Sequence, residues 1–333
     1  MNLATDYMGL KLANPLVASA SPLNADIGNI VRLAAAGAGA VVLPSLFEEQ
    51  IEAEDARRVD LIEGWSNSFA EALTYFPRQS EYAVGPDAYL SLIRKARSEV
   101  DIPVIASLNG ITNEAWLGYA LDMEEAGAHA LELNIYFIPA DLTLTGVKVE
   151  QRYREIVRSV SAALHIPVAV KLSPYFSAPG NFAVSLAEAG ARGLVLFNRF
   201  YQPDIDLQRL EPVTDLELSR PNEIRLPLLW LALLSGRVKA SLAATSGVNS
   251  PDEVVKYLLA GADVVMTTSA LLRNGVEYIG TLRRGLEAWL SERRFDSVDQ
   301  MRGLLNQSRV SDPQAFERAN YIRILQGYGS TRR

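Results

Sequence analysis

One short pattern recurs four times along the chain and constrains the fold more than any other feature. Each copy has an Ala-Gly-Ala core that follows an amphipathic run and precedes a short apolar run. The copies cover residues 36–42, 126–131, 189–195 and 260–265. The glycine supplies the left-handed conformation that ends a helix, and the alanines let the helix end lie close to a sheet. Each copy therefore predicts a helix that is followed by a buried strand.

A second kind of strand begins next to a proline, as at Pro103 and Pro167, since proline is tolerated at the first residue of a strand. Together the two patterns predict eight apolar strands: 15–19, 40–44, 104–108, 130–134, 168–172, 193–198, 240–245 and 263–267. Apolar strands that alternate with helices are typical of a parallel sheet covered on both faces. Eight such units predict an α/β fold, a closed (β/α)8 TIM barrel. An open doubly wound sheet is the alternative.

The repeat is interrupted by long segments after the second, fourth and sixth strands, at residues 45–88, 135–150 and 199–222. The first of them carries an acidic run at 48–55, which we interpret as a solvated helix face. Long loops after the strands of a barrel cluster at its carboxyl-terminal mouth, where active sites lie. We expect one domain over residues 1–333, with the barrel at about 14–290 and a C-terminal helical extension at about 291–333.

Composition argues against several classes of function. The formal net charge is −7, whereas a nucleic-acid-binding protein needs a basic face. With no cysteine and two histidines, the chain is a poor candidate for a disulfide scaffold or a metal site. No signal peptide is visible, and the longest apolar run, at 226–234, is too short to span a bilayer. A soluble cytoplasmic protein without a membrane partner is the expectation.

Lys171 is the sharpest functional candidate, because it ends an apolar strand and has no acidic neighbour in the sequence. A lysine that points into a barrel is costly unless it meets an anion or a polar ligand. The structural alternative is a lysine that reaches solvent with its ammonium group. Asn134 and Asn198 end two further strands and offer both a donor and an acceptor, which suits the edge of a planar heterocycle. Bonding to their own backbone is the alternative for both asparagines.

Two turns of small residues follow the last two strands. They are Ser246-Gly247 and Thr268-Ser269. Small residues expose backbone N–H groups and hydroxyls to a phosphate, and the loops after strands seven and eight are the usual phosphate site of this architecture. These turns predict a phosphate-bearing ligand.

These residues occur in an order that resembles the dihydroorotate dehydrogenase family of FMN-containing (β/α)8 barrels. The resemblance rests on Asn14-Pro15, Glu132-Leu133-Asn134, the run 170–176, Asn198 and Ser246-Gly247-Val248, and it covers about residues 3–290. It is strongest to the cytoplasmic class 1 branch. The runs 197–203 and 236–245 resemble a divergent group of dihydroorotate dehydrogenase-like proteins.

The resemblance implies an oxidoreductase of the kind used in pyrimidine biosynthesis, with FMN as cofactor. It implies that Lys171 lies by the flavin pyrimidine edge as the catalytic residue, and that Asn134 and Asn198 bond the flavin or the substrate. The remaining cofactor positions are Ser19, Ala20 and Ser21 against the isoalloxazine, Ser45 after the second strand, and Ser246, Gly247, Thr268 and Ser269 at the phosphate.

Two positions depart from the family pattern. The base of the family, Cys or Ser, lies three residues after the strand-ending asparagine, and this chain has Phe137 there. The lysine that the family has after the second strand is replaced by Pro44, which leaves only Ser45. The resemblance therefore implies a flavin site that is kept and a dihydroorotate site that is largely lost.

The leading hypothesis is an FMN-dependent oxidoreductase that acts on CH–CH bonds of a small heterocyclic or carbonyl substrate. One alternative is a flavin-free barrel lyase that uses Lys171 as a Schiff-base nucleophile. The other is a flavin-binding barrel without turnover. The sequence leaves the substrate, the electron acceptor and the oligomeric state open, with a homodimer as one candidate.

Overall fold

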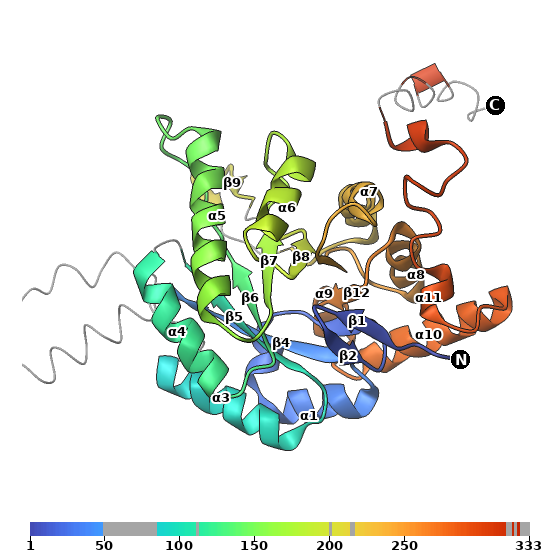
Figure 1. Ribbon diagram of the computed structural model, residues 1–333, viewed down its shortest axis with the longest axis horizontal. Helices are drawn as coiled ribbons and strands as arrows, with labels where there is room; N and C mark the ends of the chain where they lie inside the picture. The colour runs from blue at the N-terminus through green and yellow to red at the C-terminus, as the bar shows by residue number, and fades with distance from the viewer. Residues whose placement is uncertain are drawn as a thin grey trace, which may run out of the picture.

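The computed structural model describes residues 1–48, 85–110, 113–199, 202–213 and 217–317, with residues 322, 325 and 326. Eight parallel strands form a closed barrel in the order β11-β12-β3-β4-β5-β6-β7-β8 (Figure 1). Their bounds are β3 (Leu16–Ala18), β4 (Ala40–Phe47), β5 (Val104–Asn109), β6 (Ala130–Asn134), β7 (Val168–Leu172), β8 (Gly193–Leu196), β11 (Ser241–Ala244) and β12 (Val264–Thr267). The predicted TIM barrel is confirmed, and each of the eight expected strands corresponds to one barrel strand.

The helices run around the barrel in chain order, from blue α1 through green α5 to orange α10 (Figure 1). They are α1 (Ile27–Ala36), α3 (Pro86–Glu99), α4 (Asn113–Glu125), α5 (Gly146–Ala163), α6 (Pro179–Glu188), α7 (Arg225–Leu234), α8 (Pro251–Ala260), α9 (Ser269–Asn274), α10 (Tyr278–Arg293) and α11 (Val298–Met301). Short 3-10 turns lie at Pro22–Ala25, Pro221–Ile224 and Pro313–Phe316. The exact domain limits proposed from the sequence stay a prediction.

The four repeat glycines end their helices as the sequence predicts. Gly37, Gly127, Gly190 and Gly261 have φ angles of 95°, 98°, 118° and 114°. A side chain is strained in this left-handed region, so the glycine allows the chain to leave the helix and enter the next strand. The internal repeat thus corresponds to a repeated helix-to-strand connection.

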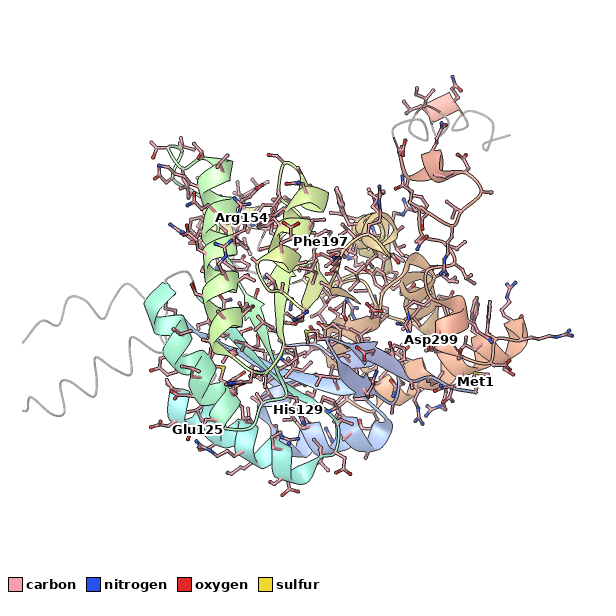
Figure 2. The ribbon with its side chains drawn as sticks, in the orientation of Figure 1. Met1, Glu125, His129, Arg154, Phe197 and Asp299 are labelled. Carbon is pink, nitrogen blue, oxygen red and sulfur yellow. The ribbon has the colours of Figure 1, made fainter. Side chains whose placement is uncertain are left out.

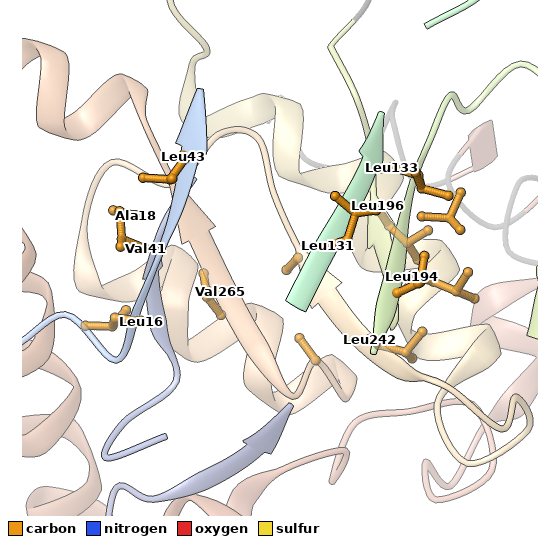
Figure 3. Packing of buried hydrophobic residues seen from close by; sticks show 14 of the residues in the cluster. Leu16, Ala18, Val41, Leu43, Leu131, Leu133, Leu194, Leu196, Leu242 and Val265 are labelled. Carbon is orange, nitrogen blue, oxygen red and sulfur yellow. The ribbon is translucent and has the colours of Figure 1, made fainter. Parts of the chain in front are cut away.

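Side chains along each strand alternate between two apolar clusters. Residues such as Leu131, Leu133 and Leu194 face the helices and form the larger cluster (Figure 3). Ala130 and Ala169 belong to the smaller cluster inside the barrel, which also contains Tyr7, Met8 and Leu12 from the first hairpin. That hairpin, β1 (Thr5–Tyr7) and β2 (Leu10–Leu12), contacts the amino ends of β11 and β12 and fills that end of the barrel.

The long loops differ in how much of them the structure describes. β4 continues three residues beyond the predicted end at 44, with a shift of register against β5 between Val42 and Ser45. Pro44 lies within this shift, where its missing N–H interrupts the ladder without ending the strand. Residues 49–84, which hold most of the first loop and its acidic run, lie outside the described residues. The loop after β8 contains a hairpin of β9 (Asp204–Asp206) and β10 (Glu211–Val213).

Gly39 is a position where the barrel requires the absence of a side chain. A Cβ atom there would overlap the main-chain carbonyl oxygen of Asn14. We expect Gly39→Ala to lower the free energy of unfolding by roughly 1–3 kcal/mol, because the first strand must move. Gly118→Ala is the matched control, since nothing lies within 4 Å of its added Cβ in α4, and it should gain roughly 0.5–1 kcal/mol. Equal urea midpoints for the two variants would contradict this account of the barrel wall.

Candidate functional site

A cavity of about 260 Å³ lies at the carboxyl-terminal mouth of the barrel. Figure 2 labels Phe197 near this mouth and His129 at the opposite end. The cavity wall brings together residues from five strand ends that are as much as 250 positions apart in the chain. Nine of the eleven residues that the sequence singled out line it: Ser19, Ala20, Ser21, Lys171, Asn198, Ser246, Gly247, Thr268 and Ser269.

The other two candidates lie beside the cavity and are not part of its lining. Asn134 accepts a 2.6 Å hydrogen bond at Oδ1 from Nδ2 of Asn198, so it orients an amide that does line the cavity. Ser45 lies within β4 and its hydroxyl is 2.8 Å from that of Ser107 on β5. The extension of β4 therefore directs Ser45 to a neighbouring strand.

The two turns predicted to hold phosphate meet at one side of the cavity. Ser246 and Gly247 both have positive φ angles, 77° and 71°. A Cβ on Gly247 would lie 2.7 Å from Ile224 Cγ2, so only glycine fits this close approach. Ser269 begins α9, where the first N–H groups have no acceptor within the helix. The turns thus present main-chain and hydroxyl donors from two strands to one place.

Ser219 connects these turns and was not found from the sequence. Its buried hydroxyl accepts a 3.1 Å hydrogen bond from the Gly247 N–H and donates a 2.9 Å bond to Ser269 Oγ. Arg273 on α9 fixes the segment by donating 2.9 Å and 3.0 Å bonds to the carbonyl oxygens of Ser219 and Leu218. These residues lie in the long loop after β8 and in a helix, and no pattern in the sequence connects them.

Lys171 has an ion-pair partner that the sequence conceals. Its Nζ lies 3.4 Å from Oε1 of Glu132, and the two side chains are 10% and 1% exposed. Glu132 lies on β6 and Lys171 on β7, 39 positions later in the chain. Both point into the barrel, because they share the strand faces of Ala130 and Ala169. The lysine therefore points inward, and the solvent-reaching alternative is wrong.

Phe137 occupies the family's base position but does not line the cavity. Its ring lies under the guanidinium of Arg152 on α5, with 4.8 Å from Cζ to the ring centroid. The ionisable residues of the lining are Lys171, Arg199 and Glu217. Arg199 is bonded to Glu223 at 2.9 Å, and the exposed Glu217 pairs with Arg220 at 3.1 Å. Among the described lining residues, Lys171 is thus the one buried ionisable group.

The donor set fits a flavin mononucleotide better than a metal ion. A planar heterocycle needs amide donors and acceptors at its edge, a cation near its anionic form and donors at its phosphate, and the cavity supplies each of these. Within the described residues, no group of three or more His, Asp or Glu side chains is placed to hold a metal. In the same part of the chain, no helix has the length and apolarity needed to cross a membrane.

Comparison with known proteins agrees with this architecture. The family model for dihydroorotate dehydrogenase matches residues 2–290. The chain is 27% identical over 310 residues to the catalytic subunit of dihydroorotate dehydrogenase B (NAD(+)) of Methanothermobacter thermautotrophicus, covering 91% of this chain and 98% of that protein. The protein of the same name from Pyrococcus abyssi is 27% identical over 308 residues, with the same coverage. The chain belongs to the dihydroorotate dehydrogenase family and is an oxidoreductase of that type.

Proposed function

We propose that this protein is an FMN-dependent oxidoreductase that acts on a CH–CH bond of a small heterocyclic or carbonyl substrate. The observation that carries the proposal is the assembly of nine flavin-site candidates, from Ser19 to Ser269, around one cavity. Family membership supports the reaction type. Bound FMN would supply the two-electron chemistry, while the protein supplies position and electrostatics.

The residues divide the work according to their chemistry. Lys171 places a positive charge at the bottom of the cavity, where it would favour a flavin ring that gains negative charge on reduction. Asn198, oriented by Asn134, offers an amide to the ring or the substrate. The Ser246-Gly247 and Thr268-Ser269 turns would hold the phosphate, with Ser219 as their connecting hydroxyl.

The partners follow from the same site. The substrate is a small molecule, because the cavity of about 260 Å³ leaves little room beside a flavin. The relatives from Methanothermobacter thermautotrophicus and Pyrococcus abyssi are named as catalytic subunits of an NAD(+) enzyme. We therefore propose that this chain also passes electrons to an external acceptor.

The lyase alternative is weakened by Glu132. A Schiff-base lysine must lose its proton before it attacks a carbonyl, whereas a buried carboxylate 3.4 Å away stabilises the ammonium. Borohydride trapping of substrate on Lys171 would revive this alternative. A flavin-binding barrel without turnover is the second candidate, and the position of Phe137 under Arg152, with no base in its place, favours it.

The proposal predicts that the apoprotein prefers FMN to riboflavin, which lacks the phosphate. We expect at least tenfold tighter binding of FMN, because a hydrogen bond to a charged group contributes roughly 1.5–3 kcal/mol. Fluorescence titration of the apoprotein with each compound measures the difference. Ser269→Ala should narrow it, whereas failure to bind FMN, or equal affinity for the two, would overturn the proposal.

A further inference from the structure

Glu132 lies directly beneath the candidate flavin site, in the middle of the barrel. In the register of β6 and β7, Asn134 is opposite Lys171, and Glu132 is opposite Ala169, two residues nearer the amino ends of the strands. Glu132 is therefore one layer deeper than the cavity floor that Lys171 forms. Its side chain is 1% exposed, and its Oε1 accepts a 3.4 Å hydrogen bond from the Lys171 ammonium.

No second cation accompanies this carboxylate among the described residues. Its Oε2 is buried without a hydrogen-bond partner in the described part of the chain, and so is the hydroxyl of Tyr7 from the first hairpin. Burial raises the pKa of Tyr7 well above its usual value near 10, and the charge of Glu132 raises it further. Tyr7 therefore stays a neutral hydroxyl, and the charge of Glu132 is balanced by Lys171.

Stability alone does not explain a buried ion pair at this place. Burying two charges costs several kcal/mol per ion, and a well-packed apolar pair of similar volume is often as stable or more stable. The surrounding interior is apolar, with Ala130, Ala169 and Val195 among its members. The pair is thus better explained by what the lysine does at the cavity than by what it adds to folding.

We propose that Glu132 is a positioning residue that holds the Lys171 ammonium at the cavity floor and offsets part of its charge, so that it sets the reduction potential of the bound flavin. This inference rests on the proposed function. Its consequence is a sign: removing the carboxylate should leave an uncompensated positive charge and make the flavin easier to reduce. Removing the ammonium should have the opposite effect.

A double-mutant cycle on the FMN-loaded protein tests the inference through the potential, which needs no knowledge of the substrate. Glu132→Gln keeps the size and one hydrogen-bonding oxygen, and it should shift the reduction equilibrium at least tenfold toward reduced flavin. Tenfold corresponds to about 30 mV for a two-electron couple. Lys171→Met should shift the equilibrium in the other direction, and the double variant should lie between the two.

A matched control separates electrostatics from a general loss of buried charge. Glu124→Gln removes a carboxylate that accepts hydrogen bonds from His165 and Ile166 at the opposite end of the barrel. We expect this variant to keep the wild-type potential. A purely structural role for Glu132 predicts weaker FMN binding or lower stability with an unchanged potential, and that result would overturn the inference.

The inference stays testable if Glu132→Gln does not fold. Lys171→Met leaves the buried carboxylate unopposed, whereas Lys171→Met with Glu132→Gln removes both charges and should fold better. The double variant is expected to have the higher potential of the two. Equal potentials would show that the Glu132 charge does not reach the flavin. Wild-type protein that binds no FMN would instead refute the proposed function.

Discussion

Millimolar dihydroorotate is expected to leave the flavin of this protein oxidised when the two are mixed without oxygen. Oxidation of that substrate requires removal of a proton from carbon, and a positioned base contributes typically about 10²–10⁴-fold to such a step. Phe137 has no proton to exchange and lies under Arg152, outside the cavity lining. Pro44 cannot supply the charge of the lysine that the family has after the second strand. Stopped-flow absorbance of the flavin measures the reaction.

Two controls define the result. Dithionite should reduce the same flavin, which shows that the cofactor itself is competent. Phe137→Cys alone should not restore reduction by dihydroorotate, because the missing charge at Pro44 is not replaced. Flavin bleaching within seconds in the wild-type protein would show that another residue acts as base, and this chain would then be a dihydroorotate dehydrogenase in activity as well as in family.

Lys171→Met is expected to make the bound flavin markedly harder to reduce. A unit charge at about 4 Å and an effective dielectric constant near 20 contributes roughly 4 kcal/mol before screening. The buried Glu132 offsets part of this charge in the wild-type protein, but in the variant it remains without its partner 3.4 Å away. The loss of the cation and the unopposed carboxylate act in the same direction, toward a lower potential.

Equilibration with redox dyes measures this potential in the FMN-loaded variant. Circular dichroism and the stoichiometry of bound FMN serve as controls for folding and loading. Lys171→Arg keeps the charge and should stay closer to wild type than Lys171→Met. An unchanged potential in a folded, FMN-loaded Lys171→Met protein would place the lysine away from the flavin.

The fold could be predicted from the sequence because its signal is local and repeated. A glycine such as Gly37 ends one helix, and the apolar run after it forms one strand, so each unit is recognisable by itself. Eight units then leave few architectures to choose from. The end of β4 was less accessible, since Pro44 indicates the end of a strand, whereas the structure accommodates it in a local shift of register.

The candidate site could be predicted only in part, for a physical reason. Residues at strand ends converge in any parallel barrel, so Lys171 and Ser246 could be assigned to one mouth without coordinates. The pairing of Lys171 with Glu132 depends instead on the register between two strands. The bonds from Ser219 depend on the course of a long loop, which no periodicity encodes. Side-chain partners across elements therefore required the structure.

The visible absorption spectrum of the purified protein, followed by acid release of its chromophore, tests the central claim most directly. The turns at Ser246-Gly247 and Thr268-Ser269 and the cation at Lys171 predict a yellow protein that releases FMN and not FAD. The released compound can be identified by chromatography against both standards. A colourless protein that does not take up added FMN would contradict the account.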